Sequence, residues 1–316
     1  MRATFSESLV RLARKDPRII LLTGDHGYAL FDAFRSQCAS QYVNAGVAEQ
    51  NMVGMAAGLA RSGFRPFVYG LSAFVPMRVL EQIKIDIAHD NLPVVLFGDG
   101  AGFVYSYLGT SHQATEDIAC TRAIPQLTVL SPADRFELSL CMDHAYALQR
   151  PVYLRMGKAD RGDIHTVPIA PPRGNGLFRV RHGTPGDLAL IATGSMVRTA
   201  VELANVAFPD AAVWSAPFIK PLDAAQVAEI CAQSSSLVTL EEHSIYGGLG
   251  SLVAEIATTL HPKPILRIGV QDIFSKLCGS YDYLLAEHRL DQINVEQQIR
   301  TFLAGPRSCW ADQAAV

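Results

Sequence analysis

Residues 44–61 constrain this chain more than any other stretch, because a single carboxylate stands at the head of an apolar run. Apolar side chains after Glu49 cover most of the circumference of the predicted helix, and such a helix is a buried helix. Gly54 and Gly58 share one face, where a second backbone can approach closely. A buried carboxylate is costly without a partner or a raised pKa. Glu49 therefore either has a specific partner or complements the positive end of the helix dipole.

Length and composition exclude several classes of function. A chain of 316 residues is too long for one small core, so two domains are expected. The net charge of -3 gives no basis for binding nucleic acid or an anionic membrane. No apolar run is long enough to span a bilayer, and the N-terminus lacks a signal-like apolar core. Six scattered cysteines are typical of reduced thiols in a cytoplasmic protein with no structural metal site.

Short apolar strands alternate with amphipathic helices along the whole chain, which is typical of an α/β protein. In the first half, strands are expected at 18–23, 41–44, 65–70, 92–98, 126–131 and 151–156, and helices at 3–15, 76–89 and 114–122. Residues 166–180 are rich in proline and glycine and have the composition of a linker. The sequence predicts two doubly wound, largely parallel sheet domains at 1–165 and 181–316.

Two glycine-rich motifs resemble ligand-binding motifs but are weak evidence for a binding site. Gly98-Asp99-Gly100 is similar to the start of the diphosphate-binding signature of thiamine diphosphate enzymes, which also needs an asparagine further along. No asparagine lies between Asn91 and Asn175, so we reject this match and treat Asp99 as a loop residue. The run that begins at Gly247 is able to bind an anion at a helix N-terminus, but a tight turn before the helix is the favoured reading.

Several longer motifs occur in the order found in the C-terminal half of transketolases. They are Gly46-Val-Ala-Glu-Gln-Asn-Met, Glu81-Gln-Ile, Gly109-Thr-Ser-His-Gln-Ala-Thr-Glu-Asp, Ile124-Pro-Gln-Leu-Thr-Val-Leu-Ser-Pro-Ala-Asp, Pro151-Val-Tyr-Leu-Arg and Glu241-Glu-His-Ser-Ile-Tyr-Gly-Gly-Leu-Gly. The chain resembles the transketolase family, with a pyrimidine-binding domain followed by the transketolase C-terminal domain. It is most similar to the second subunit of a split transketolase.

This resemblance implies a partner. The missing first half, an N-terminal transketolase-type subunit, would carry the site for the diphosphate and Mg²⁺. A heterotetramer of two such chains and two partners is the expected assembly, and this chain alone is expected to be inactive. The pyrimidine end of the cofactor, thiamine diphosphate, would bind to this chain.

The resemblance also assigns roles to single residues. Glu49 would hydrogen-bond N1′ of the aminopyrimidine and favour the tautomer that takes the proton from the thiazolium C2. Phe74 would stack on the pyrimidine, with Asp25 and Leu71 near the cofactor. His112 would face the substrate and relay protons. Without the resemblance, Phe74 reads as a core residue, Asp25 as a turn residue and His112 as a solvated loop residue.

Departures from the family pattern concentrate in the loop before Gly109. The family histidine that helps to hold the sugar phosphate falls on Gly100, and the aspartate that reads a sugar hydroxyl falls on Leu108. The phosphate-binding arginine falls on Lys158, while Arg2 keeps the remaining phosphate contact. A site that loses these groups loses much of its polar recognition. We therefore expect a donor or an acceptor other than an ordinary pentose phosphate.

The sequence predicts a thiamine-diphosphate-dependent transferase subunit that moves a two-carbon ketol unit from a ketose donor to an aldehyde or other acceptor. One alternative is the β-subunit of a 2-oxoacid dehydrogenase-type E1, which delivers a two-carbon unit to a lipoyl or carrier-protein thiol. A 1-deoxyxylulose-phosphate synthase is less favoured, because that chain is normally not split. A non-catalytic structural subunit is the remaining alternative. The second domain, with His243 at a strand end, is assigned to packing and dimerisation.

Overall fold

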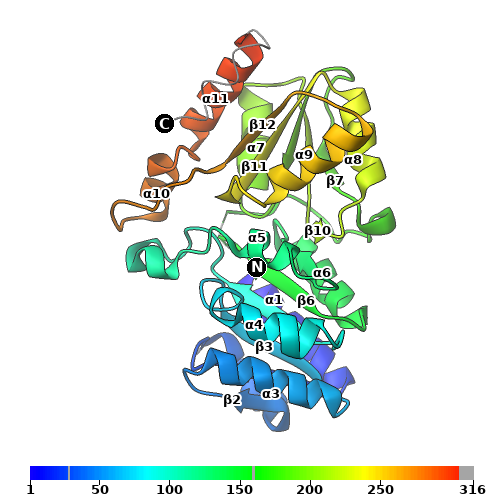
Figure 1. Cartoon of the computed structure of the whole chain (residues 1–316), viewed down its shortest axis with the longest axis vertical. Coiled ribbons are helices and arrows are strands. Elements are labelled where there is room, and N and C mark those ends of the chain that lie inside the picture. The colour runs from blue at the N-terminus through cyan, green and yellow to red at the C-terminus, as the bar shows by residue number, and fades with distance from the viewer. Residues whose placement is uncertain (28, 159–160, 306–316) are drawn as a thin grey trace.

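The computed structural model describes residues 1–27, 29–158 and 161–305. Two β-sheets flanked by helices lie one beyond the other along the long axis (Figure 1). In sheet order, the first contains β10 (Phe218–Lys220), β5 (Thr128–Leu130), β6 (Val152–Met156), β4 (Val95–Asp99), β3 (Arg65–Leu71), β1 (Ile19–Thr23) and β2 (Tyr42–Asn44). The second contains β12 (Ile265–Val270), β11 (Ser236–Ser244), β8 (Leu188–Ala192), β9 (Ala212–Ser215) and β7 (Phe178–Arg181). The predicted α/β class with mostly parallel sheets is confirmed.

Helices cover both faces of each sheet. Those of the first half are α1 (Arg2–Lys15), α2 (Asp32–Gln37), α3 (Glu49–Arg61), α4 (Leu80–Gln82), α5 (Asp117–Arg122) and α6 (Arg135–Ala147). Those of the second half are α7 (Met196–Val206), α8 (Ala224–Gln233), α9 (Leu249–Leu260), α10 (Tyr281–Glu287) and α11 (Gln292–Ala304). Short turns include η1 (Ala29–Phe31), η2 (Ala39–Gln41), η3 (Met77–Val79), η5 (Ser106–Leu108), η6 (Thr110–His112) and η7 (Arg173–Asn175). Within the described ranges, no helix is long and apolar enough to cross a membrane.

Strand β1 shows how the layers form. All five of its residues are buried, as expected of a central parallel strand covered on both faces. Its side chains alternate between the two faces of the sheet. Ile19 and Leu21 belong to the core packed under α1 and α2, whereas Ile20 and Leu22 belong to the core packed under α3.

Helix α3 is buried on one side only, so the prediction of a helix buried all round is wrong. Its solvent-facing residues are Gln50, Asn51, Met55, Gly58 and Arg61. A Cβ at Gly54 or Gly58 would meet no atom within 4 Å, so no second backbone lies against this face in the described chain. Small or flexible apolar residues such as glycine and methionine occur both in cores and on surfaces, so the apolar pattern alone did not show that this face of α3 is exposed.

Three elements differ from the sequence expectation. The helix expected at 76–89 is a short α-helical turn that continues as a π-helix, η4 (Ile83–Ala88), with five-residue spacing of its bonds. Strand β10, from the second half of the chain, pairs antiparallel with β5 at the edge of the first sheet. Strand β7 pairs antiparallel with β9 and begins within the expected linker 166–180. The domain boundaries at 165 and 181 stay a prediction.

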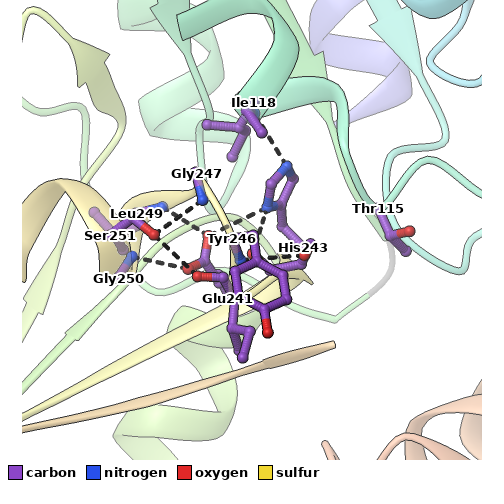
Figure 2. Close-up of polar contacts among 12 residues, drawn as sticks. Thr115, Ile118, Glu241, His243, Tyr246, Gly247, Leu249, Gly250 and Ser251 are labelled. Carbon is purple, nitrogen blue, oxygen red and sulfur yellow. Dashed lines mark hydrogen bonds and ion pairs between the residues drawn. The ribbon is translucent and has the colours of Figure 1, made fainter. Parts of the chain in front are cut away.

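The end of β11 lies at the contact between the two halves of the chain (Figure 2). His243 is fully buried there. Its Nδ1 donates to the carbonyl of Ser244 over 2.8 Å, and its Nε2 accepts from the backbone N–H of Ala119 over 3.2 Å. Both ring nitrogens are thus satisfied in the neutral imidazole. His243 joins α5 of the first half to β11 of the second.

Glu241 occupies the N-terminus of α9 (Figure 2). Its carboxylate accepts the backbone N–H groups of Leu249 and Gly250 over 2.7 and 2.8 Å. Gly247 has a positive φ of 74°, which the turn before the helix requires. The donors of this helix start are therefore used inside the chain, in agreement with a tight turn rather than a site for an external anion.

The buried histidine predicts a pH-dependent stability. Burial lowers the pKa of His243 from 6.5 to about 4. Below the unfolded value, the unfolded chain binds a proton that the folded chain excludes, so this contribution to stability falls as the pH drops toward the folded value. We expect the difference in unfolding free energy between the wild type and His243→Gln to shrink over that window, measured by urea denaturation.

Glu241 makes a contribution to stability with the opposite pH dependence, so the experiment has to control for it. Burial raises its pKa from 4.5 to about 7, so the folded chain keeps a proton that the unfolded chain loses, and its contribution falls as pH rises through that window. Because Oε2 of Glu241 lies 3.7 Å from Nδ1 of His243, the comparison is repeated with Glu241→Gln in both chains, which removes the titration of the carboxylate. A difference that is independent of pH would contradict the expected role of His243.

Candidate functional site

The predicted site residues follow neighbouring strands of the first sheet at their carboxyl ends. Asp25 follows β1, Glu49 follows β2 and Leu71 ends β3, and these strands are adjacent in the sheet. Asp99, which was not predicted as a site residue, ends the next strand, β4. This edge is where open α/β sheets bind ligands. The fold thus gathers residues that are far apart in the sequence.

Glu49 is the first residue of α3 and is only 4% exposed. Its Oε2 accepts a hydrogen bond from Nη1 of Arg78 over 2.9 Å. Its Oε1 is buried and has no partner among the described residues. The guanidinium of Arg78 also lies over the ring of Phe74, 4.2 Å from the centroid. Glu49 therefore has a specific partner and also stands at the helix N-terminus, so the two readings from the sequence hold together.

Two imidazole rings flank Phe74. The ring of His112 lies edge-on to Phe74 with 5.2 Å between centroids, and that of His26 lies 6.4 Å away. Nε2 of His26 is buried without a hydrogen-bond partner in the described chain. Sequence reasoning missed His26 and Arg78 as site residues. The only signal for His26 was its place in the glycine-flanked loop after β1, and the sequence held none for Arg78.

Asp25 and Leu71 shape the backbone at this edge. Asp25 has a positive φ of 63°, and its carboxylate accepts from the side-chain amide of Asn44 over 3.3 Å. The carbonyl of Leu71 accepts the N–H groups of Phe74 and Val75 over 2.8 and 2.7 Å. Both residues therefore fix turns beside Glu49 and Phe74, which agrees with the turn reading of Asp25.

Asp99 is a buried strand residue, so its assignment to a loop is wrong. Pairing with both neighbouring strands extends β4 as far as this residue. Its Oδ2 accepts from Arg2 over 2.6 Å and from the hydroxyls of Tyr69 and Tyr105 over 2.7 and 3.2 Å. Burial, and then the adjacent carboxylate, raise the pKa of both tyrosines. Asp99 is thus committed to three donors of its own chain.

The remaining substrate candidates are spread along the same loop and beyond it. Gly100 has a positive φ of 76°, and a Cβ there would overlap the ring of Tyr105. Leu108 is 55% exposed in η5. Nζ of Lys158 lies 5.3 Å from the ring centroid of Tyr281 in the second half. The structure thus brings Arg2 and Gly100 together around Tyr105 and puts Lys158 beside the second sheet domain.

No group of three or more His, Cys, Asp or Glu side chains in the described ranges is arranged to hold a metal ion. The described chain offers instead a buried carboxylate oxygen without a partner, an aromatic ring and two imidazoles along one sheet edge. Such a set suits an organic ligand with an aromatic ring better than a metal ion.

The fold and this edge define a two-domain α/β protein whose first domain is of the pyrimidine-binding type. Residues 1–162 match the family model described as the transketolase pyrimidine binding domain, and residues 179–295 match the transketolase C-terminal domain. The chain belongs to the transketolase family.

Similar proteins include subunits of split enzymes. The chain is 32% identical to an apulose-4-phosphate transketolase subunit of Phocaeicola vulgatus, over 92% of this chain and 93% of that protein. It is 34% identical to a 6-deoxy-6-sulfo-D-fructose transketolase subunit of a Clostridium species, over 90% of this chain and 88% of that one. A split-gene transketolase solved as an inactive β4 tetramer superposes with a TM-score of 0.84 and 30% identity, covering 96% of this chain and 97% of that one. The resemblance to the C-terminal subunit of a split transketolase is thereby confirmed.

The contact between Arg78 and Glu49 predicts an energetic coupling. In Arg78→Met, the buried carboxylate loses its only partner in the described chain, so we expect a loss of roughly 1–3 kcal/mol in unfolding free energy. Glu49→Gln should make the same arginine change much less costly. Urea denaturation of both single variants and the double variant measures this, and strictly additive effects would contradict the coupling.

Proposed function

We propose that this chain is the C-terminal subunit of a split, thiamine-diphosphate-dependent transketolase. With its partner, it transfers a two-carbon ketol unit from a ketose donor to an aldehyde or other acceptor. The observation that carries the proposal is the arrangement of Glu49 and Phe74 around Arg78, which contacts both, with one buried carboxylate oxygen left without a partner in the described chain. Membership of the transketolase family supports the same conclusion.

The residues of the sheet edge fit the pyrimidine end of thiamine diphosphate. The unpartnered Oε1 of Glu49 is a buried acceptor that a ring nitrogen bearing a proton would satisfy. The partly exposed ring of Phe74 offers an aromatic surface for stacking. When bound, the cofactor supplies the carbon nucleophile that attacks the donor carbonyl.

The side chains of this chain would then control protons and position. Glu49 shares a proton with the pyrimidine ring in a site from which burial excludes water, which strengthens the hydrogen bond. The imidazole of His112 has one nitrogen that donates and one that accepts, so it is suited to hold or move a proton at a substrate oxygen. His26, whose ring centroid lies 6.4 Å from that of Phe74, is a second candidate for that task.

An N-terminal subunit is the proposed partner, and it would contribute the diphosphate and Mg²⁺ site in a heterotetramer. Two observations support this division. Asp99, in the Gly-Asp-Gly sequence, is buried and bonded to Arg2 and two tyrosines, so it is unsuited to ligate a metal ion. The similar split-gene transketolase was solved as an inactive β4 tetramer, which fits a subunit that needs a partner.

The substrates are proposed to depart from ordinary pentose phosphates at one end. The ring of Tyr105 fills the space where a side chain at position 100 would lie, and Asp99 pairs with Arg2. Two similar subunits are named for apulose 4-phosphate and 6-deoxy-6-sulfo-D-fructose, so subunits of this kind are associated with varied sugars.

Replacing the activating carboxylate tests the catalytic role. We expect Glu49→Gln, reconstituted with the partner subunit, to lose roughly 10²–10⁴-fold in the rate of deuterium exchange at C2 of the cofactor. Binding of thiamine diphosphate, followed by fluorescence titration, should weaken far less, because glutamine still forms a hydrogen bond. The exposed Glu7→Gln in α1 is the matched control. Unchanged exchange and turnover in Glu49→Gln would favour a non-catalytic structural subunit.

A substrate scan tests the specificity. Phosphorylated and non-phosphorylated ketoses are offered as donors to the reconstituted pair, with aldoses and lipoamide as acceptors, and kcat/KM is compared. We expect the best pair to differ from xylulose 5-phosphate with ribose 5-phosphate, because the polar contacts around Gly100 and Leu108 are lost. A wide margin for that ordinary pair would overturn the prediction. Transfer to lipoamide alone would favour the E1-type alternative.

A further inference from the structure

The loop at 100–113 carries Tyr105 and His112, but its first part is embedded in the second domain. Phe103 is 1% exposed and belongs to the hydrophobic core formed under α7 and around β8 and β11. Its ring stacks on His288, with 4.6 Å between centroids and an interplanar angle of 20°. A residue of the candidate site's own loop therefore completes the core of the other domain.

Glu242 holds the backbone at this point. Its Oε1 accepts the backbone N–H of Phe103 over 2.6 Å, and its Oε2 accepts from the hydroxyls of Ser195 and Tyr281. Three donors on one buried carboxylate leave it a single orientation. Gly102 leaves room for this contact, because a Cβ there would overlap the carboxylate of Glu242. The side chain was not singled out by sequence analysis.

The other end of the loop is held by the same domain. Oγ of Ser275 donates to Oε1 of Gln113 over 2.9 Å and lies 2.9 Å from Nε2 of His288. His288 therefore contacts Phe103 at the start of the loop, and it also contacts Ser275, which binds Gln113 at the end of the loop. Helix α10 lies beside η5 at this side of the molecule (Figure 1).

Between these two ends, Ser106 is buried but the two residues after it are not. Tyr107 is 73% exposed and Leu108 55% exposed, so neither side chain fixes the loop by burial. The loop position of His112, next to Phe74, then depends on the contacts at both ends. Displacement of a catalytic group by about 1 Å is enough to cost roughly 10²-fold in rate.

We propose that Glu242 is a positioning residue for the substrate site, through which the second domain fixes the 100–113 loop and the place of His112. This inference rests on the proposed function for its effect on catalysis. It gives the second domain a role in substrate transfer in addition to the packing and dimerisation expected from the sequence. Glu242 itself acts through Phe103 and touches no reacting atom.

The structural part of this inference is tested on the chain alone. Hydrogen–deuterium exchange is measured by mass spectrometry for wild type and Glu242→Ala, and we expect faster exchange in peptides that cover residues 103–113. Peptides of α3 should keep their protection, because α3 packs on the first sheet. Unchanged exchange in the loop, in a folded variant, would overturn the inference.

The catalytic part is tested with the reconstituted pair. We expect Glu242→Ala to lower kcat/KM for ketol transfer roughly 10²-fold while deuterium exchange at C2 of the cofactor stays at the wild-type rate. General loss of structure would lower both. The loss should also be far from additive with His112→Asn, because the two changes act on one group. A parallel fall of both rates, or full additivity, would contradict positioning.

Three further variants keep the test decisive. Glu242→Gln retains an oxygen for the N–H of Phe103 and should restore most of the activity. Glu255→Ala removes another contact between the domains, to Arg122, without touching the loop, and should leave transfer unchanged. If Glu242→Ala does not fold, Ser275→Ala tests the other end of the loop with the same readouts, and an unchanged loop would overturn the inference.

The failure of the proposed function would look different. Absence of deuterium exchange at C2 of the cofactor in the wild-type pair would refute the proposed function, while the amide exchange of the loop, measured on this chain alone, would still test the role of Glu242.

Discussion

A buried ion pair between Arg155 and Asp117 stands where the two halves of this molecule meet. Arg155, near the end of β6, donates to both carboxylate oxygens over 2.8 and 3.1 Å, and the Tyr153 hydroxyl donates over 2.7 Å. Both charges are almost fully removed from solvent. The guanidinium also donates to the carbonyl of Glu242 in β11. Removal of one partner from such a pair leaves a buried charge, at a cost of about 3–5 kcal/mol. The ion pair therefore fixes α5 to the first sheet, and the same guanidinium links both to the second sheet.

The two parts of the candidate site are held in place by different domains. Glu49 and Phe74 are placed by the first domain alone, through strands β2 and β3 and through Arg78, which contacts both side chains. His112 lies on a loop whose ends are bonded to the second domain. The side chains proposed for cofactor binding and the loop proposed for substrate handling thus have separate structural supports, which allows the loop to change without disturbing the buried carboxylate.

Sequence patterns predicted what depends on local chemistry. The apolar run after Glu49 predicted α3, and the strand runs predicted the α/β class with mostly parallel sheets, but not the order of the strands within them. Contacts between distant segments were out of reach, such as Arg78 with Glu49 and Phe103 with Glu242. Asp99 was misread for a related reason. Its burial comes from pairing with two neighbouring strands and from Arg2, 97 residues away, and no local pattern encodes either.

The environment of Asp99 also explains why a change at position 100 alters the chemistry of the whole sheet edge. Tyr105 turns back over Gly100 and donates to Asp99, and the same carboxylate binds Arg2. The charge of Arg2 is therefore compensated within the chain. An anionic group of a substrate that approaches Arg2 has to compete with a buried carboxylate 2.6 Å away and is repelled by it. A family-type histidine at position 100 would displace the ring of Tyr105. Asp99 would then lose the hydrogen bond that the Tyr105 hydroxyl donates to it. Position 100, Tyr105, Asp99 and Arg2 are therefore physically coupled, and a side chain at position 100 would change the charge and shape of this sheet edge.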